Sequence, residues 1–414
     1  MKILFVTHFF QPEPNFFYGL PFAKKLVELG HKVEVLTGFP NYPAGKIYDG
    51  YKVKFLQREV MDGIPVNRVP LYPSHDQSSL KRIANYSSFA FTASTIGAAI
   101  VKSADVAFIG QGPTTIGLPG IILKYLRRIP YVYYIQDLWP DCLDATGMFT
   151  NKAGIWMTSK WCGLTYKCAS KIAVISPGYK QKLIERGVPE SKIEVIYNWC
   201  NDDVISTKKK DDQLADSMGM TGKLNVVFAG NMGKAQALEN VLEAAAILKS
   251  RQPHVQFVMI GGGVEVDNLK QKAGEMDLDN MRFFPRKPIS EIGAILSLAD
   301  ILLVHLRADP VYDYTIPSKT QAYLSVGRPI LIGVKGDAAD LVTRAKAGLV
   351  CEPENPQSIV EKVEEFCAMP KSQLDQMGNN GREFYNKELS FAVGTKRFLE
   401  LFEAVAKKPR KPGN

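Results

Sequence analysis

The chain has 414 residues, of which 46% are hydrophobic and 22% are charged, and its net charge is +9. This composition excludes a disordered, collagen-like or coiled-coil protein and predicts two or three globular domains. Residues 1–204 hold most of the excess charge, with 23 Lys and Arg against 16 Asp and Glu. We therefore expect an anionic partner for this half, and no zinc-finger, RNP or basic-helix pattern points to nucleic acid.

Short apolar runs alternate with amphipathic stretches along the chain. The amino-terminal half predicts strands at residues 3–7, 32–37, 66–70, 106–109, 131–135, 171–175 and 193–196. The carboxyl-terminal half predicts strands at residues 225–229, 256–260, 281–284, 301–305 and 330–333. Helical periodicity fills the gaps, for example at residues 20–29, 179–186, 238–250, 291–298 and 359–367. Because the strands show little polar alternation and helices separate them, we expect parallel sheets covered on both faces.

A polar run at residues 201–220 separates two such series of similar size. We therefore predict an α/β protein with two Rossmann-like domains, residues 1–202 and 203–389, facing each other across a cleft. Ligands of open α/β sheets bind outside the carboxyl ends of the strands. The cleft is then the expected active site, and hinge closure is its expected motion.

Residues 83–101 contain no charge and are flanked by Lys81, Arg82 and Lys102. Six Asn, Ser and Thr residues within the segment argue against a membrane-spanning helix. Two interpretations stay open. We favour a helix buried in the domain, and the alternative is an interfacial helix with basic flanks.

The loop after strand 225–229 predicts a phosphate site. It contains Gly230, Asn231, Gly233, Lys234 and Gln236 and leads into a helix. Glycines let a diphosphate approach the backbone, a helix N-terminus offers N–H donors, and the lysine adds a full charge. The GxGxxG and Walker spacings are absent, which disfavours dinucleotide and P-loop NTPase sites. An ordinary tight turn explains the loop equally well.

Two further loops follow strands in this half. Gly262 lies in a glycine triple after strand 256–260, where a ligand could pass close to the backbone. Arg286 follows strand 281–284 within a Pro-rich turn, where backbone groups could contact a nucleobase. Each pattern also fits a plain turn.

The strongest local pattern is the helix start at Pro317, Ser318, Lys319, Thr320 and Gln321. Proline suits the first turn of a helix, and the next residues place hydroxyls and an ammonium at the positive end of the helix dipole. A lysine is unfavourable there unless an anion is present. The pattern therefore predicts an anion site.

In the amino-terminal half, Gln136 and Asp137 directly follow strand 131–135. A polar group at this position is typical of a catalytic or substrate-orienting residue, and Asp137 is the candidate. Capping of the next helix is the alternative role. His8 also follows a strand, but we favour a structural role for it.

Seven segments, taken in order, resemble the retaining GT-B glycosyltransferases of family four. They are most similar to the branch that builds colanic acid, capsule and O-antigen repeats. The segments cover most of the chain and are 29–37, 37–51, 136–141, 175–179, 196–199, 230–233 and 317–319.

The resemblance implies that the carboxyl-terminal domain holds a nucleotide-sugar donor, and it favours a UDP-N-acetyl sugar. It implies that the amino-terminal domain binds a polyprenyl-diphosphate-linked saccharide through His8, Gln136 and Asp137. A last helix, near residues 390–406, would cross back to that domain. The enzyme would be cytoplasmic, at the inner face of the cytoplasmic membrane, and its six cysteines without CxxC or zinc spacing agree with a reducing compartment.

The family's two donor-side glutamates correspond here to Tyr314 and Ala322, so neither carboxylate is present. The usual phosphate-binding Arg and Lys correspond to Asn231 and Gln236, which leaves Lys234 as the nearby cation, and the usual histidine corresponds to Gln136.

The implied reaction needs no metal ion or cofactor. Lys319 and Lys234 would stabilise the departing diphosphate, and Asp137 would orient a substrate hydroxyl. Two other functions stay open, a nucleotide-sugar 2-epimerase of the same fold and a non-catalytic donor-binding subunit of a transferase.

Overall fold

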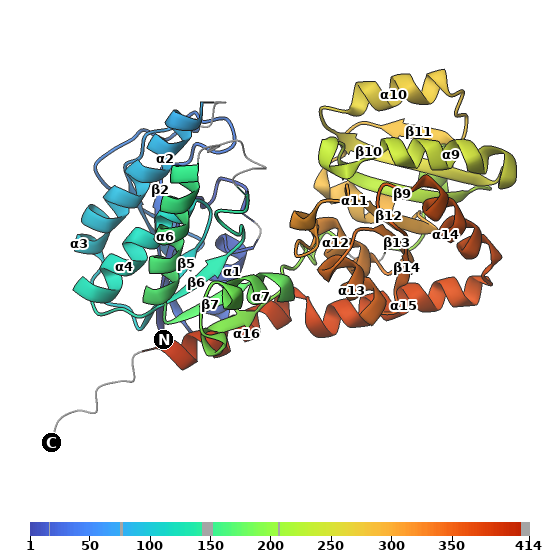
Figure 1. Ribbon diagram of the computed structural model, residues 1–414. Coiled ribbons are helices and arrows are strands. Elements are labelled where there is room, and N and C mark those ends of the chain that lie inside the picture. The colour runs from blue at the N-terminus through green and yellow to red at the C-terminus, as the bar shows by residue number, and fades with distance from the viewer. Residues whose placement is uncertain (16, 75–77, 143–151, 206–207, 407–414) are drawn as a thin grey trace. The chain divides into compact units, whose positions relative to one another are not determined.

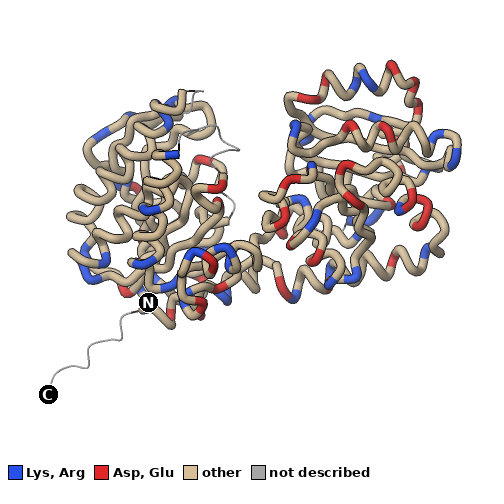
Figure 2. The backbone as a smooth tube through the Cα atoms, in the orientation of Figure 1, with Lys and Arg blue, Asp and Glu red and all other residues tan. Residues whose placement is uncertain are grey.

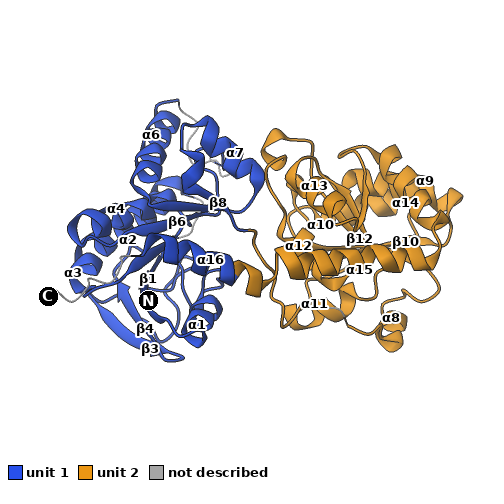
Figure 3. Cartoon of the chain, turned by 90° about the horizontal axis from the view of Figure 1, so that it is seen from below, with its two compact units in different colours: residues 1–196, 395–414 blue, residues 197–394 orange. Residues whose placement is uncertain are grey.

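The computed structural model describes residues 1–15, 17–74, 78–142, 152–205 and 208–406. The chain divides into two compact units, shown in different colours in Figure 3. Unit 1 comprises residues 1–196 and the chain from residue 395 onward, and unit 2 comprises residues 197–394. Each unit is built on its own sheet, as the sequence predicts.

The described part of unit 1 contains a sheet of eight strands in the order β3-β4-β2-β1-β5-β6-β7-β8. All pairs are parallel except β3 with β4. Apolar, β-branched and aromatic residues fill the central strands, which are buried on both faces. The strands are β1 Lys2–Thr7, β2 Lys32–Gly38, β3 Gln57–Met61, β4 Ile64–Val69, β5 Val106–Gly110, β6 Tyr131–Ile135, β7 Lys171–Val174 and β8 Ile193–Val195.

Helices cover both faces of this sheet (Figure 1). On one face, Phe398 of α16 packs against Phe22 of α1 and Phe108 of β5, with ring centroids 5.3 and 5.5 Å apart. Helices α2, α4 and α6 form the layer on the other face, as right-handed crossovers require. The helices are α1 Leu20–Glu28, α2 Ser79–Thr92, α3 Ala98–Ile100, α4 Gly117–Leu126, α6 Lys152–Cys168, α7 Pro177–Glu185 and α16 Phe391–Val405.

Unit 2 has a fully parallel sheet in the order β11-β10-β9-β12-β13-β14. Its strands are β9 Leu224–Asn231, β10 Val255–Gly262, β11 Met281–Phe284, β12 Ile301–His305, β13 Ile330–Gly333 and β14 Gly348–Val350. Its helices are α8 Asp212–Ser217, α9 Glu239–Arg251, α10 Val266–Glu275, α11 Ile289–Leu296, α12 Ser318–Val326, α13 Asp337–Arg344, α14 Pro356–Ala368 and α15 Lys371–Glu388. Side chains of β9, β10, α9 and α14 form its main core.

The division between the units lies at residue 196, six residues before the expected position. The segment after β8 belongs to unit 2 because its polar groups bind there. The backbone N–H of Cys200 donates to the Tyr385 hydroxyl (3.1 Å), and the Asp202 carboxylate accepts from the N–H of Phe391 (3.1 Å). The return to unit 1 lies after Gly394 rather than after residue 389.

The uncharged segment 83–101 is helical but only half buried. It comprises the end of α2, a π-helical turn over Ala93–Gly97, and α3. Phe89 is fully buried, whereas Phe91 is 64% exposed. The helix therefore packs on the domain through its inner face, as the favoured interpretation expects, and its outer face is exposed. Among the residues that the structure describes, none of the helices combines the length and apolar character that a bilayer crossing requires.

Candidate functional site

In unit 2, the strand order reverses at β9, which pairs with β10 on one side and with β12 on the other. The carboxyl ends of parallel strands flanking such a point leave a crevice for ligands. The loops after β9, β10 and β12 and the start of α12 meet at this edge. The sequence-predicted donor residues lie at the ends of β9 and β10, in the loops that follow, in the turn after β11 and at the start of α12.

Lys319 lies in the first turn of α12 and is partly buried against the end of β9. Its Nζ is 4.0 Å from the centroid of the Phe228 ring, and a Cβ built on Gly230 would lie 3.4 Å from the same atom. No described residue forms an ion pair or hydrogen bond with this ammonium group. Burial lowers the pKa of Lys319 to about 7. The buried surroundings disfavour the protonated, charged form of Lys319. A bound anion would raise the pKa of Lys319 and so favour the charged form.

Helix α12 is fixed to β9 by a hydrogen bond beneath Lys319. The Tyr323 hydroxyl accepts from the backbone N–H of Ala229 (2.9 Å). Thr320 and Gln321 are also buried, and the Gln321 amide nitrogen donates to the carbonyls of Pro317 (2.8 Å) and Ser318 (3.1 Å). The Gln321 side chain thus binds the start of its own helix, whereas the buried Thr320 hydroxyl has no hydrogen-bond partner among the described residues. The donor contacts of both residues stay predictions.

The β9 loop is tied to its neighbours by Gln236. The Oε1 atom of Gln236 accepts from the N–H of Gly233 (2.9 Å), and its carbonyl lies 2.8 Å from Nδ1 of His305. The backbone N–H of Glu354 donates to Nε2 of His305 (3.3 Å), so the ring is neutral with its proton on Nδ1. Burial lowers the pKa of His305 and favours this neutral form. Gln236 therefore shapes the loop through its side chain and its carbonyl, and its donor contact stays a prediction.

The exposed loop side chains are Asn231 and Lys234. Lys234 lines a cavity of about 580 Å³ together with Arg307, Glu239, Glu265 and other residues. Lys319 is not among its lining residues. Arg307 was missed by the sequence analysis, although its place two residues after β12 gave a usable signal.

The glycine triple serves close packing of β9 against β10. A Cβ on Gly261 would lie 1.9 Å from the Gly230 carbonyl oxygen, and a Cβ on Gly263 would lie 2.3 Å from that of Met232. The predicted donor residue Gly262 is the exception, because its built Cβ would meet only Arg286 Nε, at 4.0 Å. Gly262 and the exposed Arg286 are therefore neighbours at this edge, while the flanking glycines are structural.

In unit 1, the order reverses between β1 and β5, and a cavity of about 540 Å³ lies at the carboxyl ends of the strands. Its polar lining includes Gln136 and Asp137. Aromatic side chains supply much of the rest and are contributed by Phe9, Phe17, Tyr18, Tyr42, Tyr86 and Trp139. Aromatic faces beside a few fixed polar groups suit a sugar ring, which has apolar C–H faces and hydroxyl edges.

Asp137 is accessible from this cavity. Its carboxylate accepts no hydrogen bond from the described residues, and desolvation raises its pKa above the usual value. Capping, the alternative role of Asp137, concerns the next helix, and residues 143–151 lie outside the described part of the chain. The Gln136 carbonyl accepts from the Tyr179 hydroxyl at 3.4 Å.

His8 lies behind the cavity wall and does not line the cavity. It is 1% exposed, and its Nε2 is 2.8 Å from Oδ1 of Asn85. Its ring meets those of Phe9, Tyr86 and Phe89 edge-on. The predicted acceptor contact of His8 is thus replaced by a structural role, supporting two aromatic residues of the wall.

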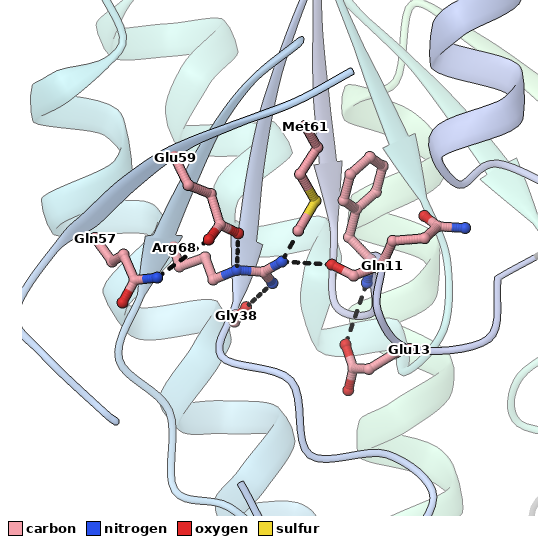
Figure 4. A network of polar contacts seen from close by, with 8 residues as sticks. Gln11, Glu13, Gly38, Gln57, Glu59, Met61 and Arg68 are labelled. Atoms are coloured by element: carbon pink, nitrogen blue, oxygen red, sulfur yellow. Dashed lines mark hydrogen bonds and ion pairs between the residues drawn. The ribbon is translucent and has the colours of Figure 1, made fainter. Parts of the chain in front are cut away.

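Figure 4 shows a network of polar contacts around Arg68, which lies near the end of β4. Arg68 is fully buried, its Nε is 2.6 Å from a carboxylate oxygen of Glu59, and its Nη1 donates to the Gly38 carbonyl (2.9 Å). Its Nη2 donates to the carbonyl of Gln11. The guanidinium therefore joins the ends of β2, β3 and β4 to the loop after β1.

Glu13 completes this scaffold. One of its carboxylate oxygens accepts from the N–H groups of Asn41 and Tyr42 (2.8 Å each), and the other accepts from Phe10 (3.2 Å). Burial raises the pKa of Glu13 despite these hydrogen bonds. The bonds fix the loops that present Phe9 and Tyr42, whose ring centroids lie 4.8 Å apart.

Two family models match consecutive parts of the chain. Residues 19–199 match a model described as a glycosyl transferase 4-like domain, and residues 210–384 match one described as glycosyl transferases group 1. Between them the matches include every residue of the two edges described above except the loop that directly follows β1.

Curated relatives cover most of the chain. WcaI of Escherichia coli (strain K12), named as a colanic acid biosynthesis glycosyl transferase, is 27% identical over 90% of this chain and 93% of its own length. WbjE of Pseudomonas aeruginosa, named as a glycosyltransferase, is 24% identical over 72% and 74%.

Solved structures share the fold. Anabaena HepE in complex with UDP has a TM-score of 0.69 at 16% identity, covering 98% of this chain and 100% of its own. Sucrose-phosphate synthase from Thermosynechococcus elongatus has a TM-score of 0.66 at 14% identity, covering 97% and 98%.

Proposed function

We propose that this chain, a glycosyltransferase whose residues 210–384 match the glycosyl transferases group 1 and whose residues 19–199 match a glycosyl transferase 4-like domain, transfers a sugar from a nucleotide-sugar donor to a saccharide acceptor. Its membership in the glycosyltransferases and its GT-B fold of two parallel-sheet domains agree with the sequence predictions. The donor, the stereochemistry and the acceptor belong to the proposal.

The observation that carries the proposal is the position of Lys319. An ammonium group packed on Phe228 and Gly230, at a helix start and without a carboxylate partner in the described structure, needs an anion to be stable when charged. A nucleoside diphosphate supplies that anion. HepE, which shares the fold, was solved with UDP, and this supports UDP as the nucleotide.

In the proposed reaction the bond between the anomeric carbon and the donor's β-phosphate oxygen breaks. Charge grows on the departing diphosphate, and Lys319, with exposed Lys234 and the backbone N–H groups at the start of α12, stabilises it. We propose that these protein cations act without a metal ion, which predicts that a chelator leaves the rate unchanged.

The acceptor side of the proposal rests on the aromatic cavity of unit 1. The acceptor sugar would stack on its aromatic rings, and the Asp137 carboxylate would accept a hydrogen bond from a substrate hydroxyl. Attack from the face of the departing diphosphate, which takes the acceptor proton, would retain the anomeric configuration. The step balances because the sugar passes from the diphosphate to the acceptor oxygen, and the proton of the acceptor hydroxyl passes to the diphosphate.

The relatives support a role in bacterial surface polysaccharide synthesis, since WcaI is named for colanic acid. We propose a polyprenyl-diphosphate-linked saccharide as the acceptor and a peripheral place at the inner face of the cytoplasmic membrane. The basic amino-terminal half supports both, because polyprenyl diphosphate and the membrane face are anionic.

The proposal is tested by a thermal-shift screen of UDP, GDP and ADP and their sugars, followed by transfer assays with those that bind. A ligand that binds only the folded chain raises its Tm. We expect UDP and a UDP-N-acetyl sugar to raise it. Formation of an epimer without acceptor would indicate a 2-epimerase, and binding without any transfer would indicate a non-catalytic subunit.

A further inference from the structure

A second cavity in unit 1 adjoins the aromatic cavity. It has a volume of about 270 Å³, its lining is almost entirely apolar, and it lies between α2 and α6. The two cavities share Tyr86, Pro113 and Trp139 as a common wall. Along α2, Arg82 lines the aromatic cavity and the next residue, Ile83, lines the apolar one. A polar and an apolar compartment thus lie side by side along one helix.

The helical layer that contains this groove has an unusual charge pattern. Helices α2, α4 and α6 contain no Asp or Glu. Their charged residues are all basic, as Figure 2 shows on the corresponding turns, and they are Lys81, Arg82, Lys124, Lys152, Lys160 and Lys167. A surface of this kind attracts anionic lipid head groups or a diphosphate.

Large apolar side chains are exposed on the same helices. They include Phe91 on α2 and Trp156, Met157 and Leu164 on α6, which are 47–64% exposed. The Nζ of Lys160 lies 5.8 Å from the ring centroid of Trp156. Exposed aromatic residues beside lysines are typical of a membrane interface.

We propose that the apolar groove between α2 and α6 holds the first carbons of the acceptor's polyprenyl chain, while the aromatic cavity holds its saccharide. This inference rests on the proposed function, because it takes the acceptor to be lipid-linked. The diphosphate that joins chain to saccharide would lie at the common wall, beside Arg82. A groove of this volume suits the start of a long chain, whose remainder stays in the bilayer.

The proposal is tested by binding, with farnesyl diphosphate as the chain-bearing probe and inorganic diphosphate as the chain-free one. Wild-type protein should bind farnesyl diphosphate at least about tenfold more tightly, because burial of the prenyl carbons removes apolar surface from water. Met157→Gln, in the groove, should remove most of this preference. Leu164→Gln is the matched control, on the same helix and also exposed but outside the groove, and should keep it.

A wild type without preference for the chain, or an equal loss in both variants, would overturn the inference. Ile83→Gln tests the opposite wall of the groove and should act as Met157→Gln does. The underlying function is scored separately by transfer to a chain-free saccharide acceptor. Transfer with the same KM for chain-free and prenyl-linked acceptors would leave the function standing and reject the groove. Binding of farnesyl diphosphate without any transfer would reject the transferase function and leave the groove as a prenyl-binding site.

Discussion

The carboxyl edges of the two sheets have the same architecture and opposite chemistry. At the edge of unit 2, glycines leave the backbone open and Lys319 lies at a helix start without a described carboxylate partner. At the edge of unit 1, aromatic rings surround Asp137, a carboxylate whose pKa burial raises. One edge suits a diphosphate, and the other suits a sugar.

The parallel sheet therefore determines where a ligand binds, while the loops determine which ligand it is. In unit 2, β9 and β10 approach so closely that Gly261 and Gly263 are required. In unit 1, the buried Arg68 and Glu13 hold longer loops that place rings over the strand ends. The following substitutions should change one edge and leave the other intact.

We expect the largest effect from Lys319→Met, with transfer reduced by about 10²–10³-fold, as for removal of one preorganised charge-stabilising group. The free energy of unfolding of the Lys319→Met variant should not fall. The pKa of Lys319 is lowered to about 7, so between pH 7 and its ordinary value the unfolded chain binds more protons. Folded-state stability therefore rises with pH in this window, and Met removes the cost of the charged form.

The measurement is kcat beside Tm at pH 7, with Lys335→Met as the control. Lys335 is exposed and pairs with Glu352 at 2.9 Å, so its loss should change neither quantity much. Parallel loss of kcat and Tm in Lys319→Met would show a structural lysine.

Asp137→Asn should lower kcat/KM by about a hundredfold, a typical effect of losing a positioned proton-handling or orienting carboxylate. UDP affinity should stay unchanged, because the substitution lies in unit 1. Since the folded-state pKa of Asp137 is raised, the ionised form is disfavoured on folding, and Asn should keep or raise Tm above that pKa. A normal rate for Asp137→Asn would return this residue to the capping role.

Gly261→Ala should destabilise unit 2 by about 2–4 kcal/mol, because its Cβ would clash with a backbone carbonyl and its φ is +145°. Gly262→Ala is the matched control and should stay within about 1 kcal/mol. Denaturant unfolding checks both. Equal destabilisation by the two would refute the distinction between the structural glycine and the open one.

The smallest effect is expected from Phe9→Ala, which removes one ring of the acceptor cavity. The KM for the acceptor should rise about tenfold, corresponding to the loss of roughly 1.4 kcal/mol of ring contact. The KM for the donor should not change, and steady-state kinetics with both substrates varied gives the two values. An equal rise in both would contradict the assignment of the rings to the acceptor.

The regular part of the fold could be predicted because buried parallel strands are apolar on both faces. The observed bounds of β6, β11, β12 and β13 are those expected. The antiparallel edge strand β3 was missed because none of its residues is buried and Arg58 and Glu59 interrupt its apolar pattern. The short strand β14 was missed because its residues are not buried either.

Sequence order predicts which residues lie at strand ends and helix starts, and only that part of the site could be predicted. Lys319 and Asp137 follow strands or begin a helix, and both lie where expected at their own edges. The side chains of Gln236 and Gln321 bind backbone groups of their own loop or helix start, and Thr320 is buried, none of which the order of residues reveals. Arg307 and the aromatic cavity come from separate segments, which only the folded sheet assembles.

If Lys319 holds the diphosphate of a nucleotide, calorimetric titration of UDP between pH 7 and pH 9 should show it. We expect the UDP affinity of the wild type to fall by up to about tenfold per pH unit, because a lysine with a pKa of about 7 loses its proton in this range. Lys319→Met should bind UDP weakly at every pH. Tight UDP binding by Lys319→Met, with the pH dependence of the wild type, would contradict the account.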